Sequence, residues 1–434
     1  MAQGLRFENT TAAAGPSRHN SQLRQATMTS LEASASALAP SSRLPLWSIA
    51  RQLMAARLKA AGAGSLSIAF PDGGIIRHQG REAGPAAELS LHRWRALWRL
   101  FSDGDVGLAR AYLDGDCSTS DLKALLMFGA ANASTLSRAL SSSKLSVLCS
   151  RVRHRLKRNT RRGSRRNIAA HYDLGNEFYK PWLDRTMSYS SALYTAGGQS
   201  LESAQEAKLE RIAALLELQN GHNVLEIGCG WGGLAKHLAA KRDCSVTGIT
   251  LSVEQLQHAR SSLAGSGTRV DFQLADYRDV PGRYDRIVSV EMLEAVGERY
   301  WPVYFQKLRD SLTSDGVAVL QVITIADGVF EEYRRRPDFI QQFIFPGGML
   351  PTAQVIREQA ERVGLRLELH QDFGPSYATT LLEWRQRFLS AWHGIEALGF
   401  DERFRRMWEY YLAYCEAGFD TGAISVGLFK FRPS

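Results

Sequence analysis

An acidic residue followed by closely spaced glycines marks the stretch of this 434-residue chain that is best suited to hold a ligand. Residues 223–233 read N-V-L-E-I-G-C-G-W-G-G, so Glu226 lies inside an apolar run that leads into four glycines. Glycines at such a turn let a ligand approach the backbone closely. A dinucleotide loop would be spaced G-x-G-x-x-G. The spacing E-x-G-x-G-x-G-G instead favours a ligand without phosphate, S-adenosylmethionine, over a ligand-free turn, and makes Glu226 a candidate cofactor-binding residue.

Alternating strand and helix patterns predict the elements that position this loop. The strands are expected at 224–227, 244–251, 270–274, 284–290 and 316–324. The helices are expected at 203–218, 234–240, 253–264 and 300–312. Such alternation predicts the α/β class, with a mostly parallel, Rossmann-like sheet and helices on both faces. A ligand should then lie at the carboxyl edge of the strands.

Polar and aromatic side chains lie just beyond the ends of these strands. Thr250 and Gln255 are placed to bond a ribose, and Asp276 and Tyr277 to bond and stack an adenine. The other members of the set are Glu294 after the fourth strand, and Gln321 and Ile323 within the fifth. Each residue alone would more often be an ordinary turn residue, and only the set as a whole indicates a binding site.

Composition limits the class of protein. Hydrophobic residues make up 44% of the chain and charged residues 22%, which is typical of a soluble globular protein. No apolar window of about 18 residues predicts a membrane span, and no signal peptide is evident. The five cysteines are scattered, with no C-x-x-C pair. We therefore expect no disulfide framework, no metal site and a cytoplasmic location.

The positive charge predicts an anionic partner. The formal net charge is +9, and residues 151–166 carry nine arginines and lysines. A run of this kind can dock on anionic lipid headgroups, contact nucleic acid or remain a solvated linker. No nucleic-acid-binding motif accompanies it. We therefore expect peripheral association with the inner face of the membrane and no nucleic-acid partner; homodimer formation is left open.

The pattern divides the chain into four segments. Residues 1–42 are expected to be disordered, 43–130 to form a small α+β domain, 131–166 to be a basic linker and 167–434 to form the catalytic domain. In the small domain, strands are expected at 65–70 and 74–77, followed by a helical pattern from 91 to 112 that is broken at 103–105. Trp94, Trp98 and Phe101 share one face of that pattern. Core packing of this face is favoured over contact with lipid.

An ordered set of motifs resembles the family of cyclopropane-fatty-acyl-phospholipid synthases and mycolic acid methyltransferases. The likeness runs from about 167 to 430 and is fainter in the N-terminal domain. Besides the glycine loop, the motifs are H-Y-D-L-G-N-E-F-Y (171–179), M-S-Y-S-S-A-L-Y (187–194), T-G-I-T-L-S-V-E-Q (247–255), F-I-F-P-G-G-M-L-P (343–351), F-G-P-S-Y-A-T-T-L (373–381) and Y-Y-L-A-Y-C-E-A-G-F (410–419).

The resemblance implies an enzyme that adds the methyl carbon of S-adenosylmethionine across a cis double bond of a phospholipid acyl chain. The implied cofactor contacts are Tyr189, Ser190, Gly228, Gly230, Thr250, Leu251, Gln255 and Tyr277. The implied cage for a bound bicarbonate base consists of Ser191, Glu294, Gln321, Ile323 and Tyr377, with Tyr172 nearby. Cys415 matches a family cysteine once proposed as a nucleophile, but an alkene needs no enzyme nucleophile, and we interpret it as a core residue.

The physical chemistry of the reaction agrees with this division of roles. An alkene is a weak nucleophile, and its attack on a sulfonium methyl leaves a carbocation in an apolar channel. A carboxylate such as Glu294 and the aromatic faces of Tyr172 and Tyr377 would stabilise that cation.

Three positions depart from the family pattern. Ser191 and Gln321 stand where the family usually has a cysteine and a histidine, and Ala295 stands where a histidine commonly follows the glutamate. Neither serine nor glutamine titrates near neutrality, so methyl transfer is better supported than ring closure. The leading hypothesis is a cyclopropane synthase. The alternatives are a methyltransferase that gives a methyl-branched or methylated unsaturated chain, and a non-catalytic protein that binds cofactor and lipid.

Overall fold

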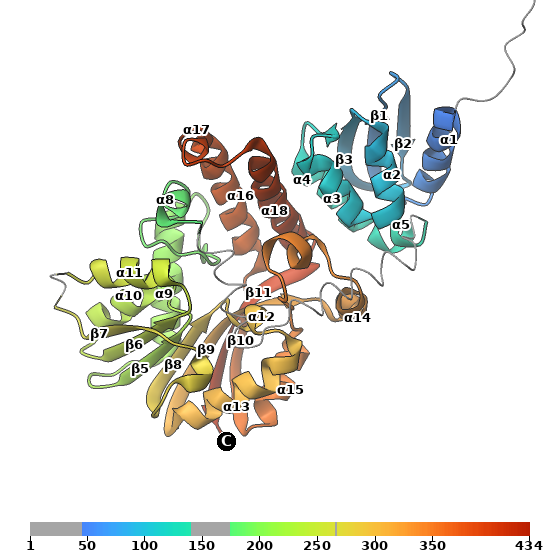
Figure 1. Ribbon diagram of the computed structural model, residues 1–434. Coiled ribbons are helices and arrows are strands. Elements are labelled where there is room, and N and C mark those ends of the chain that lie inside the picture. Colours follow the sequence, from blue (N-terminus) through green and yellow to red (C-terminus); the bar gives the residue numbers. More distant parts are fainter. Residues whose placement is uncertain (1–45, 140–173, 265–266) are drawn as a thin grey trace, which may run out of the picture. The chain divides into compact units, whose positions relative to one another are not determined.

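The computed structural model describes residues 46–139, 174–264 and 267–434, which contain two β-sheets with their associated helices (Figure 1). The segment expected to be disordered (1–42), the basic run (151–166) and Tyr172 lie outside the described residues. The four domain boundaries therefore stay a prediction.

The N-terminal sheet has four strands in the order β2-β1-β3-β4. Its strands are β1 (Ala63–Ala69), β2 (Ile75–Gln79), β3 (Glu82–Leu91) and β4 (Cys117–Ser118). The helices in this part of the sequence are α1 (Leu46–Leu58), α2 (Trp94–Asp103), α3 (Asp105–Leu113), α4 (Leu122–Ala131) and α5 (Ala133–Ala139). The two expected strands and the helix break are confirmed, because β1, β2 and the α2–α3 junction at Gly104 lie where the pattern placed them.

Strand β3 was not predicted from the sequence. It pairs in parallel with β1 and antiparallel with β4. Its residues E-A-G-P-A-A-E-L-S-L include glycine, proline and alanines, which are poor strand formers, and only its second half buries alternate residues, at Ala87, Leu89 and Leu91. Pairing with β1 therefore decides its conformation.

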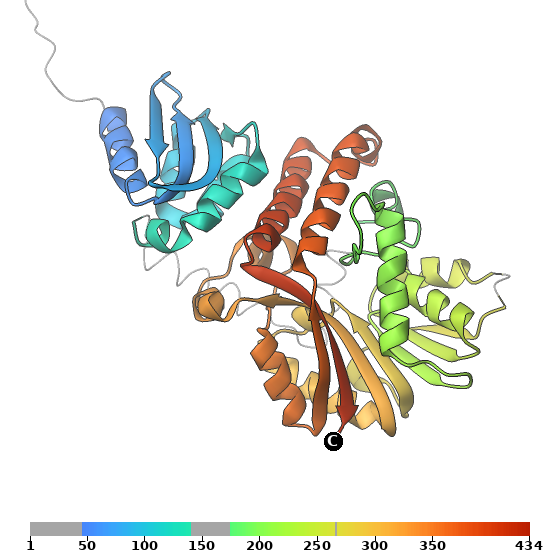
Figure 2. The same cartoon turned by 180° about the vertical axis from the view of Figure 1, so that it is seen from behind.

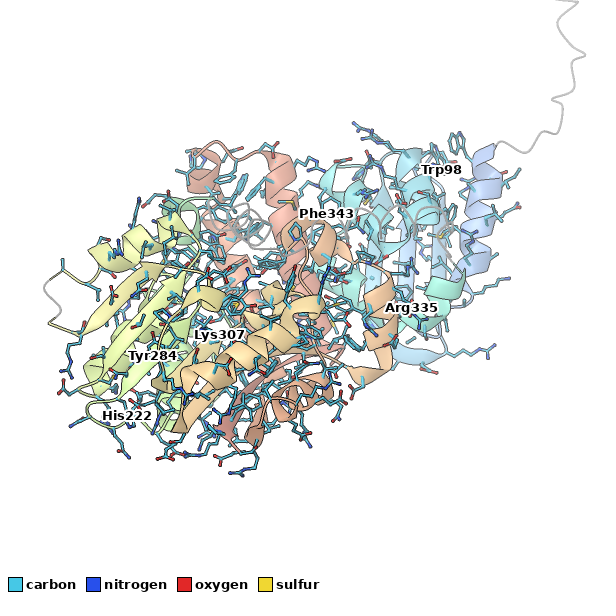
Figure 3. The ribbon with its side chains drawn as sticks, turned by 60° about the horizontal axis from the view of Figure 1, so that its bottom comes forward. Trp98, His222, Tyr284, Lys307, Arg335 and Phe343 are labelled. Carbon is cyan, nitrogen blue, oxygen red and sulfur yellow. The ribbon has the colours of Figure 1, made fainter. Side chains whose placement is uncertain are left out.

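The aromatic face of α2 is not a core face, so the core-packing interpretation is wrong for Trp98. The buried side chains of α2 are Ala96, Leu97 and Leu100, whereas Trp98 is 72% exposed. Its place on the helix can be followed in Figure 3. The apolar stripe that packs inward is offset from the aromatic stripe by part of a turn, and spacing alone could not tell the two apart.

The C-terminal sheet has seven strands in the order β10-β11-β9-β8-β5-β6-β7. The strands are β5 (Asn223–Ile227), β6 (Ser245–Thr250), β7 (Val270–Leu274), β8 (Tyr284–Val290), β9 (Leu312–Ile325), β10 (Leu365–Asp372) and β11 (Ile424–Pro433). Strands β5 to β9 pair in parallel, and β11 pairs antiparallel with both β9 and β10. The predicted mostly parallel Rossmann-like sheet is confirmed; the antiparallel pair β10–β11 was not predicted.

Helices cover both faces of this sheet (Figures 1 and 2). On one face lie α9 (Leu201–Leu215), α10 (Gly233–Lys241) and α11 (Val253–Ser261); on the other lie α13 (Trp301–Ser311) and α15 (Ala353–Glu361). The core beneath α13 and α15 includes Leu225, Ile287, Phe305 and Phe429, all at most 1% exposed. The predicted helices at 203–218, 234–240, 253–264 and 300–312 are α9, α10, α11 and α13, confirmed within a few residues.

Further helices and short helical turns connect these strands and helices along the sequence. They are α8 (Asn176–Tyr179), η1 (Tyr277–Asp279), α12 (Leu293–Val296), η2 (Glu298–Tyr300), α14 (Asp327–Arg335), η3 (Ile340–Ile344), α16 (Gly374–Ser390), α17 (Trp392–Glu396) and α18 (Glu402–Asp420). Helices α16 and α18 pack against each other and rise beyond one end of the sheet (Figure 1). His222 and Tyr284, at the amino ends of β5 and β8, mark the opposite end (Figure 3).

None of the helices within the described ranges combines the length and apolarity that crossing a membrane requires.

The turn after β5 depends on glycine at its tightest point. Gly232, the N-cap residue just before α10, has φ +85°, in the left-handed region that residues with side chains rarely adopt. A Cβ added at Gly232 would lie 2.5 Å from the ring of Phe272, which is buried in β7. This close approach lets the helix lie against the sheet directly after the strand.

We predict that Gly232→Ala lowers the free energy of unfolding by more than the penalty for a side chain in the left-handed backbone region. Gly221 is a matched control because its φ is +84° and an added Cβ would meet no atom within 4 Å. Gly221→Ala should cost about 1–2 kcal/mol of unfolding free energy, the penalty of the left-handed conformation. Gly232→Ala should cost about 1–3 kcal/mol more because of overpacking. Denaturant unfolding of both variants measures the difference, and equal costs would contradict a collision with Phe272.

Candidate active site

One cavity opens at the carboxyl ends of β5, β6 and β8, the edge where the sequence predicted a ligand. Its lining includes nearly all the predicted cofactor contacts, which are Tyr189, Ser190, Glu226, Gly228, Gly230, Thr250, Leu251, Gln255 and Tyr277. It also includes residues that the sequence analysis did not select, among them Met187, Lys208, Trp231 and Glu291. The parallel sheet thus brings side chains from distant parts of the chain to one site.

The loop before α9 forms one wall of the cavity and folds around the carboxylate of Asp184. That carboxylate accepts hydrogen bonds from the backbone N–H of Thr186 at 2.7 Å and of Ser188 at 2.8 Å. Between them Met187 adopts φ +57°. The turn presents Tyr189 to the cavity, and its hydroxyl lies 2.9 Å from the hydroxyl of Tyr411 on α18.

A buried lysine and a buried glutamate face the cavity from opposite elements. Lys208 on α9 donates to Ser190 Oγ at 2.8 Å, and burial lowers the pKa of its ammonium to about 8. Burial raises the pKa of Glu226 on β5 to about 8, and its Oε2 has no hydrogen-bond partner among the described residues. An unpartnered buried carboxyl oxygen and a desolvated ammonium are both costly, so such a pair indicates a ligand.

These groups fit the amino-acid end of S-adenosylmethionine. The unpartnered oxygen of Glu226 suits an ammonium, and Lys208 with Ser190 suits a carboxylate. The glycine-loop pattern indicated Glu226 and the resemblance indicated Ser190, but neither indicated Lys208. A signal for it existed, because Lys208 occupies the apolar stripe of α9 together with Leu201, Ala204 and Ile212. A lysine at a core position of a helix is a functional candidate.

The polar residues expected at the ribose and adenine are held by local bonds. Thr250 Oγ1 donates to Gln255 Oε1 at 2.8 Å, and both residues line the cavity. Tyr277 lines it as well, and its ring lies edge-on to Tyr304 at 5.3 Å. Asp276 instead accepts two hydrogen bonds from the Arg278 side chain, at 2.8 and 2.6 Å, and does not line the cavity that the described residues form.

A second cluster begins where the cavity ends, and at its centre is Glu291, which the sequence analysis did not select. Glu291 Oε1 accepts from the backbone N–H of Ser191 at 2.9 Å and from Gln321 Nε2 at 2.8 Å. Glu291 Oε2 accepts from the Tyr377 hydroxyl at 2.6 Å. Three residues of the expected bicarbonate cage therefore bind one protein carboxylate.

The other expected cage residues meet at Glu294. Its Oε1 accepts from the backbone N–H of Ile323 at 2.5 Å, whereas its buried Oε2 has no partner among the described residues. Burial and the neighbouring charge of Glu291 raise the pKa of Glu294 to about 8. Burial also raises the pKa of Glu291, but its three donors and Lys208 oppose that shift. Of the two glutamates, Glu291 is the one whose surroundings favour the ionised form, because it has three donors and Lys208, whereas Glu294 has one donor and is the better site for a proton.

The bicarbonate expected from the resemblance does not fit this cluster. The donors assigned to it, Ser191 N–H, Gln321 Nε2, Tyr377 OH and Ile323 N–H, are all bonded to the two glutamates. The Ser191 hydroxyl donates to the carbonyl of Ala192 at 2.9 Å. A further anion would lie beside an ionised carboxylate without a donor of its own.

Two expected catalytic residues remain, Tyr172 and Cys415. Tyr172 lies outside the described residues. Cys415 lies on α18, where burial strongly raises the pKa of its thiol. A protonated thiol is a poor nucleophile, so Cys415 is not placed to attack, although the residue is only partly buried and does not belong to the core.

Comparison with known proteins shows that the chain is similar to methyltransferases and cyclopropane synthases. The family model described as "Mycolic acid cyclopropane synthetase" matches residues 159–429. The chain is 41% identical to tuberculostearic acid methyltransferase UfaA1 of Mycobacterium tuberculosis over 79% of this chain and 82% of that protein. It is 37% identical to cyclopropane-fatty-acyl-phospholipid synthase of Escherichia coli, over 74% and 81%. The crystal structure of mycolic acid cyclopropane synthase CmaA1 complexed with SAH and CTAB aligns with a TM-score of 0.58 at 31% identity, over 62% and 97%.

We predict that Lys208→Met lowers affinity for S-adenosylmethionine roughly 10- to 100-fold at pH 7, the cost of a charged hydrogen bond. The ratio of the two dissociation constants should decline above pH 8, where the wild-type ammonium loses its charge. The ratio is informative because Glu226, Glu291 and Asp184, the charged groups that act on Lys208, remain in both proteins. Calorimetry measures it, with the exposed Lys241→Met as the control; a ratio near one at pH 7 would exclude the contact.

Proposed function

This chain belongs to the mycolic acid cyclopropane synthetase family of S-adenosylmethionine-dependent enzymes, and on that premise we propose that it transfers the cofactor's methyl carbon to a cis double bond in a phospholipid acyl chain. The observation that carries this proposal is the position of Glu291. It lines the cofactor cavity and also joins the cluster formed with Tyr377 and Gln321.

The cluster suits a reaction that passes through a carbocation. When bound, the cofactor supplies a methyl group that leaves its sulfur without the bonding electrons. The two electrons of the alkene form the new carbon–carbon bond, and the positive charge remains on the other alkene carbon. Glu291 supplies negative charge beside it, and Glu294 adds a second negative charge only when it ionises above pH 8. Tyr377, stacked on Phe419 at 4.5 Å, presents an aromatic face.

The next proton transfer decides the product. Loss of a proton from the new methyl closes a cyclopropane ring, whereas loss from a neighbouring chain carbon leaves a methylated alkene. The substitutions at Ser191, Gln321 and Ala295 and the similarity to tuberculostearic acid methyltransferase support the methylated chain. Ring closure is the second candidate, supported by the similarity to the E. coli cyclopropane-fatty-acyl-phospholipid synthase.

An anionic membrane surface is the proposed location of the substrate. The net charge of +9 and the basic run at 151–166 would attract the protein to acidic headgroups at the inner face of the membrane. The cis double bond lies within the acyl chain, so the lipid must enter an apolar channel to reach the cluster.

We predict that the protein moves isotope from methyl-labelled S-adenosylmethionine into vesicles of cis-unsaturated phosphatidylglycerol. Transfer should be lost with saturated lipid, which offers no alkene, and should fall with added salt, which screens the headgroups. Extraction of the lipid and counting of its label measure this. An absence of label in unsaturated lipid would leave the non-catalytic binding protein as the better description.

The same product identifies the outcome of the proton transfer. Ring and methyl-alkene isomers have equal mass, so proton NMR is required. A vinylic methyl signal supports the methylated chain, and upfield ring protons support the cyclopropane.

We further predict that Glu294 produces an alkaline step in the rate at saturating cofactor. Its pKa of about 8 keeps it protonated at pH 7, and its ionisation above pH 8 places a second negative charge beside the cation. The wild-type kcat should therefore rise from pH 7 to 9, and Glu294→Gln should remove the rise while cofactor affinity is kept. Glu298→Gln, which alters a surface pair with Arg334, is the control and should retain the rise. A step that persists in Glu294→Gln would assign it to another group.

A further inference from the structure

Glu291 joins the cofactor cavity to the second cluster. Together with Val290, Met292 and Ala295 it lines the cavity, and its carboxylate reaches Ser191, Gln321 and Tyr377. These three partners come from the loop before α9, from β9 and from α16. No other carboxylate within the described ranges combines these two positions.

We propose that Glu291 is the base of the reaction: its carboxylate accepts the proton that the lipid cation loses, in place of a bound bicarbonate. This inference rests on the proposed function, because it assigns a residue to a step of that reaction.

The backbone at Glu291 is held in an unfavourable conformation. Its φ is +50°, in the left-handed region, which costs a non-glycine residue about 1–2 kcal/mol. Its backbone N–H donates to the carbonyl of Gln321 at 2.8 Å. Within the described ranges, the other non-glycine residues with positive φ are Met187, which also lines the cavity, and Glu217. Strain of this kind persists where the surroundings impose it, and it concentrates at functional sites.

The charges around Glu291 make it the member of the glutamate pair that can accept a proton. It has three hydrogen-bond donors, whereas Glu294 has one donor and a free oxygen among the described residues. The ammonium of Lys208 also favours the ionised form of Glu291. A carboxylate in this state is negative before methyl transfer and can become neutral afterwards.

The proton transfer balances without a further reactant. A C–H bond of the cation breaks, and its electron pair forms either the third bond of the cyclopropane ring or a new C=C bond. The proton binds a carboxylate oxygen of Glu291. The positive charge brought by the sulfonium and the negative charge of Glu291 thereby cancel, and the neutral acid releases its proton to solvent after the product leaves.

Two substitutions at Glu291 distinguish the loss of the base from the loss of the whole side chain. Glu291→Gln keeps the shape of the side chain but removes the base. Glu291→Gly removes the side chain, relieves the positive φ and frees the donors of Ser191, Gln321 and Tyr377 for an added anion. Glu331→Gln, which removes an exposed carboxylate that pairs with Arg334 and Arg335, is the matched control.

The experiment measures label transfer in buffer freed of carbon dioxide, with and without added bicarbonate. Wild type and Glu331→Gln should work equally well in both. Glu291→Gln should lose about 100-fold or more in kcat, the usual contribution of a general base, and bicarbonate should not restore it. Glu291→Gly should be equally inactive without bicarbonate and regain at least about tenfold with it, as expected of a replaced base.

Two results would overturn the inference: stimulation of the wild type by bicarbonate, or turnover of Glu291→Gln near the wild-type rate. Failure of the proposed function is a different result, in which the wild type transfers no label to any unsaturated lipid. Binding of ¹³C-bicarbonate, followed by NMR, then still tests the inference. A bound signal in Glu291→Gly but not in the wild type supports the assignment of the anion position to Glu291, and a bound signal in the wild type refutes it.

Discussion

A carboxylate buried at the carboxyl edge of the sheet must accept hydrogen bonds from the protein, and the active-site cluster supplies the donors. Removing a carboxylate from water costs several kcal/mol unless donors replace the water. Glu291 receives those donors from a backbone N–H, an amide and a phenol. They come from segments about 30 to 100 residues away in sequence, so the folding of three separate parts of the chain is needed to satisfy one side chain.

In the cofactor cavity, by contrast, buried polar groups of the described residues are left without full hydrogen bonding. Glu226 keeps an unpartnered oxygen among the described residues, and burial lowers the pKa of Lys208 to about 8. Both arrangements lower the stability of the protein without ligand. The same groups are then available to make directed contacts with a zwitterionic ligand. The two regions meet at Glu291, so the group that binds cofactor and the group that would act on lipid share one wall.

Aromatic side chains supply the apolar surroundings that strengthen these charges. Tyr189 lies 5.3 Å from Trp384, and Tyr377 stacks on Phe419, which joins the loop before α9 to α16 and α18. Electrostatic interactions are stronger where water is excluded. The α16–α18 pair therefore contributes to the chemistry through packing. Its cysteine, Cys415, does not act as a nucleophile, because burial raises the pKa of the thiol and keeps it protonated.

The sequence by itself determined the parallel sheet and the glycine turn, because these depend on local patterns: an apolar run, glycines and alternating strand and helix. Residues just beyond strand ends, such as Thr250 and Tyr277, also line the cavity, whereas Tyr189 and Leu251 were reached only through the resemblance. The sequence also placed Ser191, Gln321 and Tyr377 in one cluster, through the resemblance. Only the tertiary structure decided what fills that cluster. Glu291 directly follows β8, and no sequence motif singled it out; its position depends on a positive φ and on donors from β9 and α16. Strands β3, β10 and β11 and the exposed face of Trp98 were likewise settled by pairing and packing between distant segments, which no local pattern records.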